Sequence, residues 1–164
     1  MLQARQSQFH FASEIEKGLN QSLLASTQRL AGDTAGAKAN AEQARNTFEH
    51  LYKDQPDNPN LAAEIALANA VLGEKDLALK GAERAIVLSA TAKDPFMGPS
   101  FQENLALIQT IFGENNRAIS TLSQLLQTRP YGQTITPALL RLDPIWDPLR
   151  ADPVFQKLCE EKKP

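Results

Sequence analysis

Three Asp-Pro pairs near the C-terminal end of the chain could form a site with its own chemistry. Carboxylates packed so closely can bind a metal ion, or can work together as an acid and a base. Aspartate is equally a preferred N-cap residue, and proline is favoured at the first position of a helix. The pairs therefore predict either an acidic site or the successive starts of short helical turns. They are Asp143-Pro144, Asp147-Pro148 and Asp152-Pro153.

The residues around these pairs favour helix starts. Arg141 and Arg150 can neutralise the carboxylates, which leaves little need for a metal ion. Apolar residues between the pairs would cover the exposed end of the helices that precede them. These residues are Trp146, Leu149, Phe155 and Leu158. We expect short capping helices over residues 136–161, and neither a metal site nor an acid–base site.

Other residues that carry catalytic chemistry are few and isolated. His10 and His50 each lack a second histidine four residues away, and Cys159 has no histidine near it in the sequence. A nucleophile needs such a positioned base, and a single cysteine forms no internal disulfide or thiolate cluster. The motifs of phosphate-binding loops, dinucleotide-binding folds, zinc proteases and serine hydrolases are also missing. The sequence therefore predicts a chain that is not an enzyme and uses no metal or cofactor.

Length and composition suit one domain, or one short repeat array, of 164 residues. A hydrophobic content of 42% is enough for a continuous core. The net charge is only -2 and the basic residues form no block, which argues against binding to nucleic acid phosphates. No apolar run approaches the ~20 residues that span a bilayer, and the N-terminus lacks the apolar segment of a signal peptide. We expect neither nucleic acid binding nor membrane insertion.

An internal repeat covers much of the chain before the Asp-Pro pairs. Three segments align without gaps: LLASTQRLAGDTAGA at 23–37, EIALANAVLGEKDLA at 64–78 and NLALIQTIFGENNRA at 104–118. Each contains an apolar residue followed by alanine, then a side-chain amide, an apolar pair, a glycine and a second alanine. Agreement at so many positions indicates a true repeat. Its glycines are Gly32, Gly73 and Gly113, so the repeats are 41 and 40 residues apart.

The repeat pattern is typical of a hairpin of two helices. Apolar residues recur at helical spacing, and glycine can end the first helix in the left-handed conformation. The acidic residue after each glycine favours the start of the second helix, and the alanines allow the two helices to approach closely. Pro56, Pro95 and Pro130 would then end each unit. We expect hairpins over 19–56, 60–94 and 101–130. An N-terminal helix over 1–18 would end near Gly18 and Asn20, and a loop would cover 95–101.

These units resemble the tetratricopeptide repeat (TPR), a helix-turn-helix of about 34 residues. The third unit fits the family best, because Leu105-Ala106, Gly113, Ala118 and Pro130 fall at the family spacings. In the first unit the second helix is about two turns too long. The resemblance implies one all-α domain over 1–164, a right-handed superhelix of about three units with short C-terminal capping helices.

A closer resemblance covers roughly residues 23–160. The segments DPFMGP and RLDPIWDPLRADPVF are similar to the C-terminal TPR region of bacterial multidomain signalling proteins. In such proteins this region follows a kinase, an adenylate cyclase, a winged-helix regulator or a TolB-like domain. The resemblance implies a protein–protein interaction module that docks or regulates, and it carries no catalytic residues. It favours a cytoplasmic location, with the extracytoplasmic part of a membrane-anchored parent as the alternative.

The family resemblance also implies a peptide-binding concave face formed by the first helices. Its residues would be Ser22, Leu23, Ser26, Arg29, Ala63, Glu64, Leu67, Ala70, Glu103, Asn104, Leu107 and Thr110. Two of them, Glu64 and Glu103, would repel a carboxylate, so the groove suits a neutral or basic segment better. Alternatively, these residues face the C-terminal helices of the same chain, or a neighbouring domain.

Two further expectations concern ligands and self-association. A small molecule or peptide bound in the groove would make the chain a sensor, and a dry pocket closed by residues 94–101 would favour that function. The loop over 88–101 is apolar enough to pack back as a lid or to contact a partner. The N-terminal helix carries Phe9, Ile15 and Leu19 near helical spacing. A homo-oligomer could form through this helix, and sedimentation of a chain that lacks residues 1–17 would test it.

Overall fold

The computed structural model describes residues 13–91, 97–128 and 135–160. In these ranges the chain forms α-helices and one 3-10 helix and contains no strand, so the predicted all-α class is confirmed. The helices are α2 (Glu14–Leu30), α3 (Thr34–Asp54), α4 (Pro59–Leu72), α5 (Lys75–Thr91), α6 (Gly98–Ile111) and α7 (Asn115–Thr128). They are followed by α8 (Pro137–Leu142), the 3-10 helix η1 (Pro144–Leu149) and α9 (Pro153–Leu158).

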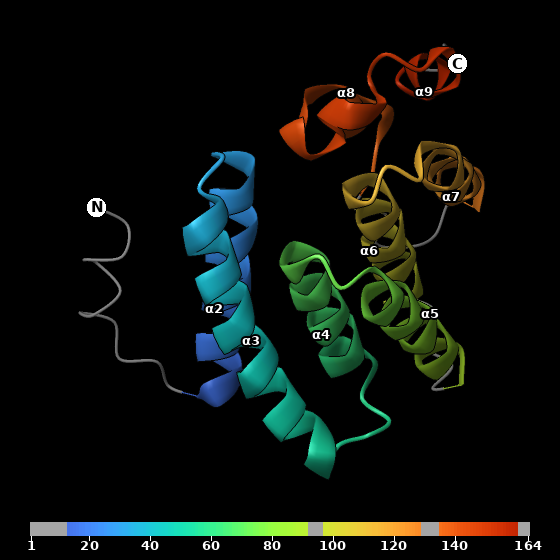
Figure 1. The fold of residues 1–164 in the computed structure, drawn as a ribbon. Coiled ribbons are helices and arrows are strands. Elements are labelled where there is room, and N and C mark those ends of the chain that lie inside the picture. The colour runs from blue at the N-terminus through green and yellow to red at the C-terminus, as the bar shows by residue number, and fades with distance from the viewer. Residues whose placement is uncertain (1–12, 92–96, 129–134, 161–164) are drawn as a thin grey trace.

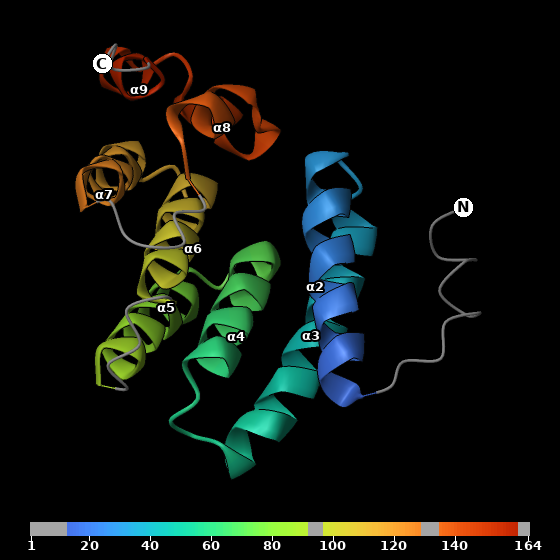
Figure 2. The ribbon, with the colours of Figure 1, turned by 180° about the vertical axis from the view of Figure 1, so that it is seen from behind.

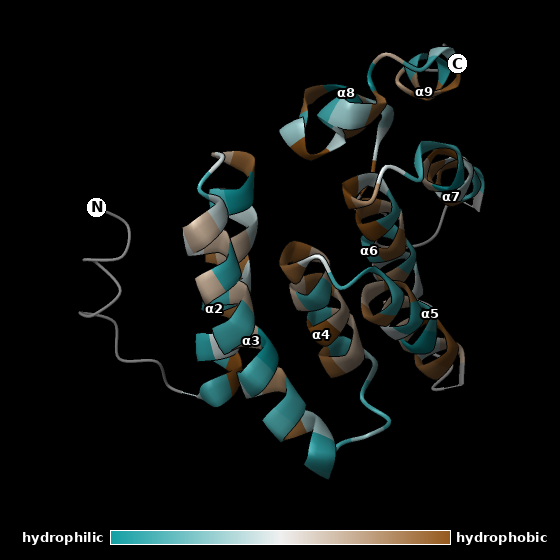
Figure 3. Ribbon diagram, viewed as in Figure 1, coloured by the Kyte–Doolittle hydropathy of each residue, from teal (hydrophilic) through white to brown (hydrophobic). Residues whose placement is uncertain are grey.

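The long helices form three consecutive hairpins: α2 with α3, α4 with α5, and α6 with α7 (Figures 1 and 2). Successive hairpins pack through α3 on α4 and through α5 on α6. The first helices are also neighbours, because α4 contacts both α2 and α6. Among the six long helices the central α4 is the most apolar, and Figure 3 shows brown and tan turns along it with a few teal ones. Its many alanines are buried and allow this close packing.

Glycine ends the first helix of each hairpin, as predicted. Gly32, Gly73 and Gly113 have φ angles of 79°, 90° and 71°, in the left-handed region that favours glycine. The next residue then donates its backbone N–H to the carbonyl of the repeated amide residue, for example Asp33 to Gln28 at 2.9 Å. Asp33 also caps α3, because its Oδ1 accepts the N–H of Gly36. The aligned residues thus close the three turns in the same way.

The repeated side-chain amides join the two helices of a hairpin. In the first hairpin Asn40 donates to Gln28 Oε1 at 2.8 Å, and in the third Thr121 donates to Gln109 Oε1 at 3.1 Å. Both donors lie twelve residues after their amide. In the second hairpin this position is Gly81, which has no side chain to donate. There Asn69 Oδ1 accepts instead from Arg45 of the preceding hairpin.

Two predicted boundaries are wrong. A single helix, α2, runs through Gly18 and Asn20, so residues 14–18 belong to the first hairpin and no turn separates them from it. The predicted loop over 95–101 is wrong at its end, because α6 already begins at Gly98 with Pro99 in its first turn. Residues 1–12 and 92–96 lie outside the described part, and with them Phe9, His10 and the DPF of the apolar loop.

The C-terminal helices cover the third hairpin, as expected from their apolar residues. Trp146, Leu149 and Phe155 are buried in one cluster with residues of α6 and α7, and Leu158 packs against it. The cluster's other buried members are Ala106, Ala118, Ile119, Leu122, Leu125, Ile135 and Leu140. These helices therefore supply the apolar cover that the last unit of a repeat array needs.

Two of the three Asp-Pro pairs begin helices. Asp143 caps η1 by accepting the N–H of Ile145, and Asp152 caps α9 by accepting those of Val154 and Phe155. The third prediction is wrong, since Pro148 lies inside η1 and starts no separate helix. The Asp147 carboxylate pairs instead with the guanidinium of Arg150, three residues later.

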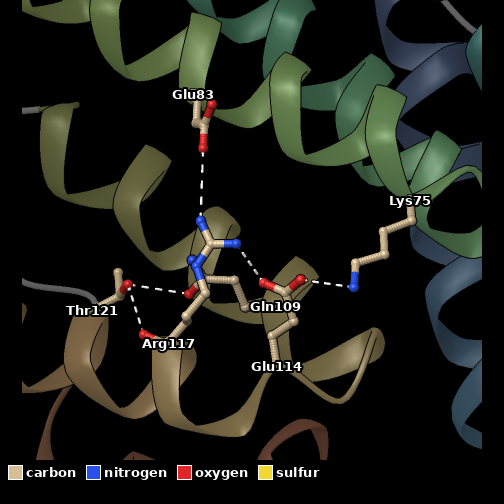
Figure 4. A network of polar contacts seen from close by, with 6 residues as sticks. All are labelled: Lys75, Glu83, Gln109, Glu114, Arg117 and Thr121. Atoms are coloured by element: carbon tan, nitrogen blue, oxygen red, sulfur yellow. Dashed lines mark hydrogen bonds and ion pairs between the residues drawn. The ribbon is translucent and has the colours of Figure 1, made fainter.

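An ion network spans the second and third hairpins (Figure 4). Lys75 Nζ lies 2.7 Å from Glu114 Oε1, and Arg117 Nη1 lies 2.6 Å from Glu114 Oε2. Arg117 also approaches Glu83 of α5 at 3.8 Å. The hydrogen bond from Lys75, with Arg117 beside it, lowers the pKa of the Glu114 carboxyl from its ordinary 4.5, although desolvation opposes the shift. Glu114 thus links the two hairpins as an anion.

The lowered pKa of Glu114 predicts a loss of stability in acid. The unfolded chain binds this proton near pH 4.5 and the folded chain only at lower pH, so the contribution is complete above pH 4.5. It disappears as the pH falls through the folded pKa. Glu114→Gln should lower the melting temperature at pH 7 by on the order of 1–2 °C, and the difference should shrink as the pH falls below 4.5. Thermal melts of both proteins across this range test it, and a difference independent of pH would contradict it.

Candidate functional site

A cavity of about 210 Å³ opens between α2, α3 and α4. Small side chains make room for it: Ala25 of α2 and Ala41 and Ala44 of α3 are fully buried at its floor. From α4, Leu67, Ala68 and Val71 form an apolar wall together with Glu64. The complete lining is Leu19, Ser22, Leu23, Ala25, Ser26, Ala41, Ala44, Glu64, Leu67, Ala68 and Val71.

The rim of this cavity is apolar and exposed to solvent. Leu23 is 65% exposed and Leu19 is 45% exposed. Both belong to a stripe of exposed apolar residues along α2 that also includes Ile15 and Leu30. The spacings of four and seven residues place the stripe on one face of the helix. Large apolar residues concentrated on one exposed face are typical of a binding surface.

Glu64 is the only ionisable side chain among the described residues that line the cavity. Burial raises the pKa of its carboxyl above the ordinary value, and the nearby Ser22 hydroxyl offsets this only in part. Within the described part of the chain, Glu64 Oε2 and Ser22 Oγ are both buried and form no hydrogen bond of normal geometry, although the Ser22 hydroxyl lies near enough to affect the carboxyl. Leaving a buried carboxylate oxygen without a hydrogen bond costs free energy. The site therefore lacks a donor or cation for this carboxylate.

The structure brings together five of the twelve residues predicted for the concave face. Ser22, Leu23, Ser26, Glu64 and Leu67 line the cavity. Four of the others, Arg29, Glu103, Asn104 and Leu107, are not in this lining and are partly buried. Their partial burial places them against other parts of the chain, and burial lowers the pKa of Arg29.

Several of the predicted concave-face residues lie against other parts of the chain in the free structure. Leu107 packs against the C-terminal cluster, which is the alternative that the sequence had left open. Ala63, Ala70 and Thr110 are buried, and the Thr110 hydroxyl donates to the carbonyl of Ala106. Because α6 is covered by the C-terminal helices, the family positions on this helix offer less free surface than those on α2 and α4.

Leu19 and Val71 line the cavity although neither is among the family positions of the concave face. Leu19 lies four residues before Leu23, and Val71 lies four residues after Leu67. Extending the helical period from the predicted residues in both directions would have found them. The two alanines of α3 at the floor carried no comparable signal, since nothing local distinguishes them from core positions.

The remaining candidates for chemistry are accounted for locally. The carboxylates of Asp143 and Asp152 accept backbone N–H groups, and that of Asp147 pairs with Arg150. The described residues hold no group of three or more His, Cys, Asp or Glu side chains placed to bind a metal ion. Cys159 is partly buried; burial raises the pKa of its thiol, and Arg150 and Arg141 oppose this.

In the described ranges, no helix has the length and apolarity needed to cross a membrane.

No family model, curated protein or solved structure matches this chain. The internal repeat itself is visible in the structure, as three glycines with left-handed φ, the aligned amides that precede them and buried alanines between the paired helices.

Proposed function

We propose that this chain is a non-catalytic protein–protein interaction module whose groove between α2 and α4 receives a segment of a partner protein. The observation that carries the proposal is the cavity itself, with apolar walls, an exposed leucine rim and one buried carboxylate. An apolar pocket with few polar groups is the usual form of a recognition site. A core packed for stability alone would have closed it.

The proposed architecture is a TPR-like right-handed superhelix of three hairpins with a C-terminal cap. Its support is the repeat of 41 and 40 residues, the consecutive packing of the hairpins and the adjacency of α2, α4 and α6. In such an array the first helices form the concave face, where α2 and α4 would present the groove. By its resemblance, the module would be the docking or regulatory region of a bacterial signalling protein, with the cytoplasm favoured.

The size and lining of the cavity favour docking over the sensing of a small molecule. Sites that enclose drug-sized ligands typically measure about 300–1,000 Å³, and this cavity holds about 210 Å³. That volume suits one or two side chains of a peptide. Its described walls come from α2, α3 and α4, and none comes from residues 97–101, the described part of the segment that a closed sensor pocket would use.

Leu23→Asp should weaken partner binding by roughly tenfold or more, because it places a charge at the apolar rim of the groove. Leu77→Asp on α5 is the matched control: Leu77 is 55% exposed, comparable with Leu23 at 65%, and does not line the cavity. Both substitutions should leave the fold intact. The measurement is quantitative affinity capture from a lysate of the cells that produce the protein. The native chain, Leu23→Asp and Leu77→Asp each serve as bait. Equal recovery of every partner by both variants would refute the groove assignment.

A further inference from the structure

We propose that the groove between α2 and α4 recognises a basic side chain: its occupant is a peptide segment that places a lysine or arginine beside Glu64. The aliphatic part of that side chain would lie against the apolar walls of the cavity. This inference rests on the proposed function, since it names the chemistry of the partner at the same site. A partner with this chemistry matches the groove in charge, in shape and in hydrogen bonding.

The charge argument begins with the unpartnered oxygen of Glu64. An ionised carboxylate in a mainly apolar cavity is destabilising until a donor or a positive charge compensates it. Nothing in the lining from α2, α3 or α4 carries a positive charge, and in the described structure Glu64 Oε2 accepts no hydrogen bond of normal geometry, with only the neutral Ser22 hydroxyl named beside it. An incoming ammonium or guanidinium group would supply both missing elements. An acidic segment would be repelled.

The shape argument comes from the apolar residues around the carboxylate. Lysine and arginine combine a long aliphatic stem with a charged end, and the stem packs readily on apolar surface. Ala25, Ala44, Ala68 and Leu67 offer such a surface close to Glu64. A small hydrated cation would gain nothing from these walls. Neighbouring apolar side chains of the same peptide would then contact Leu19 and Leu23 at the rim.

Peptide selection followed by substitution tests the inference. A display library of random 12-residue peptides is selected on the full chain, and peptides that lose binding to Leu23→Asp are kept. Each lysine or arginine of a kept peptide is then replaced by glutamine, one at a time. We expect one such replacement to weaken binding to the native chain by roughly tenfold or more. Binding of the replaced peptide should be insensitive to Glu64→Gln.

The protein variants complete a double-mutant cycle. Glu64→Gln should weaken binding of the parent peptide by the same factor as replacing its lysine or arginine. Two control variants should bind the parent peptide as tightly as the native chain does. Glu49→Gln makes the same charge change at an exposed position of α3, and Asn104→Ala alters a predicted groove residue outside the cavity. The cycle separates a direct contact between the cation and Glu64 from a general effect of net charge.

Each other outcome of the selection overturns one idea or both. Groove-dependent peptides that need no cation, or that bind Glu64→Gln equally well, would overturn this inference and leave the proposed function standing. A selection in which no peptide depends on Leu23 would overturn both. If the chain sediments as a dimer that Glu64→Gln dissociates, a second copy is the occupant and the inference in its present form is wrong.

A second readout uses the free chain and needs no peptide. Glu64→Gln should raise the melting temperature by about 2–4 °C at pH 7, because it removes an ionised carboxyl that lacks a partner. Burial raises the folded pKa of Glu64 above 4.5, so this gain should disappear below pH 4.5, where the carboxyl is protonated in both states. A lower melting temperature for Glu64→Gln at pH 7 would mean that the carboxylate is already satisfied within the chain, contrary to the inference.

Discussion

Replacing Trp146 with alanine should lower the free energy of unfolding by about 3–5 kcal/mol, the range for truncating a large aromatic side chain in a core. Trp146 is only 1% exposed and is among the largest buried side chains of the cluster that joins the C-terminal helices to the third hairpin. The substitution leaves a cavity between η1 and the helices α6 and α7, which contact it directly. For a chain of this size, the melting temperature should fall by on the order of 10 °C.

The loss should be uneven along the chain, because a repeat array transmits stability mainly between neighbours. Thermal melts followed by circular dichroism give the total effect, and hydrogen exchange locates it. Protection should fall first in α6 and α7 and least in α2 and α3. Trp146→Phe is the control that keeps most of the apolar volume and should cost far less. Added divalent metal should leave the melting temperature of the native chain unchanged, and a metal-dependent rise would revive an acidic site at the Asp-Pro pairs.

The hairpins and the cap could be predicted because their signals are local. A glycine with left-handed φ, an acidic residue after it and an aspartate before proline each act within one turn of helix. Asp147 carries the same signature as Asp143 and yet begins no separate helix. Its carboxylate pairs with Arg150 three residues later. Both sites have the same Asp-Pro sequence. They differ in what the carboxylate contacts, which is a backbone N–H for Asp143 and the guanidinium of Arg150 for Asp147.

The groove could be predicted only in part, because it depends on how two hairpins pack. Of the residues that family spacing selects, Ser22, Leu23, Ser26, Glu64 and Leu67 line one cavity. Family spacing could not show that the C-terminal helices cover Leu107, since that contact joins residues far apart in the sequence. Nor could it show that Glu64 has an oxygen without a partner. Pairing of buried groups is a property of tertiary packing, which no local pattern encodes.

Phe48→Ala should be the second large loss, again about 3–5 kcal/mol. The ring of Phe48 is fully buried and packs with Ala44 and Leu61, so it joins α3 to α4. It also lies directly against Gly18 of α2. A Cβ added to Gly18 would lie 2.7 Å from Phe48 Cζ, closer than such atoms approach in practice. Three helices therefore meet at one ring, and glycine is the residue that admits it.

This contact reverses the meaning of Gly18. Its weak helix propensity predicted a turn, whereas its lack of a side chain lets α2 approach the Phe48 ring inside a continuous helix. Gly18→Ala should gain about 1 kcal/mol in propensity but lose about 1–3 kcal/mol by overpacking, a small net destabilisation. In the Phe48→Ala background the clash is gone, and the same substitution should become stabilising. Chemical denaturation of the two single variants and the double variant measures the coupling. Additive effects would show that Gly18 and Phe48 act independently, and the interpretation of Gly18 as a packing residue would be wrong.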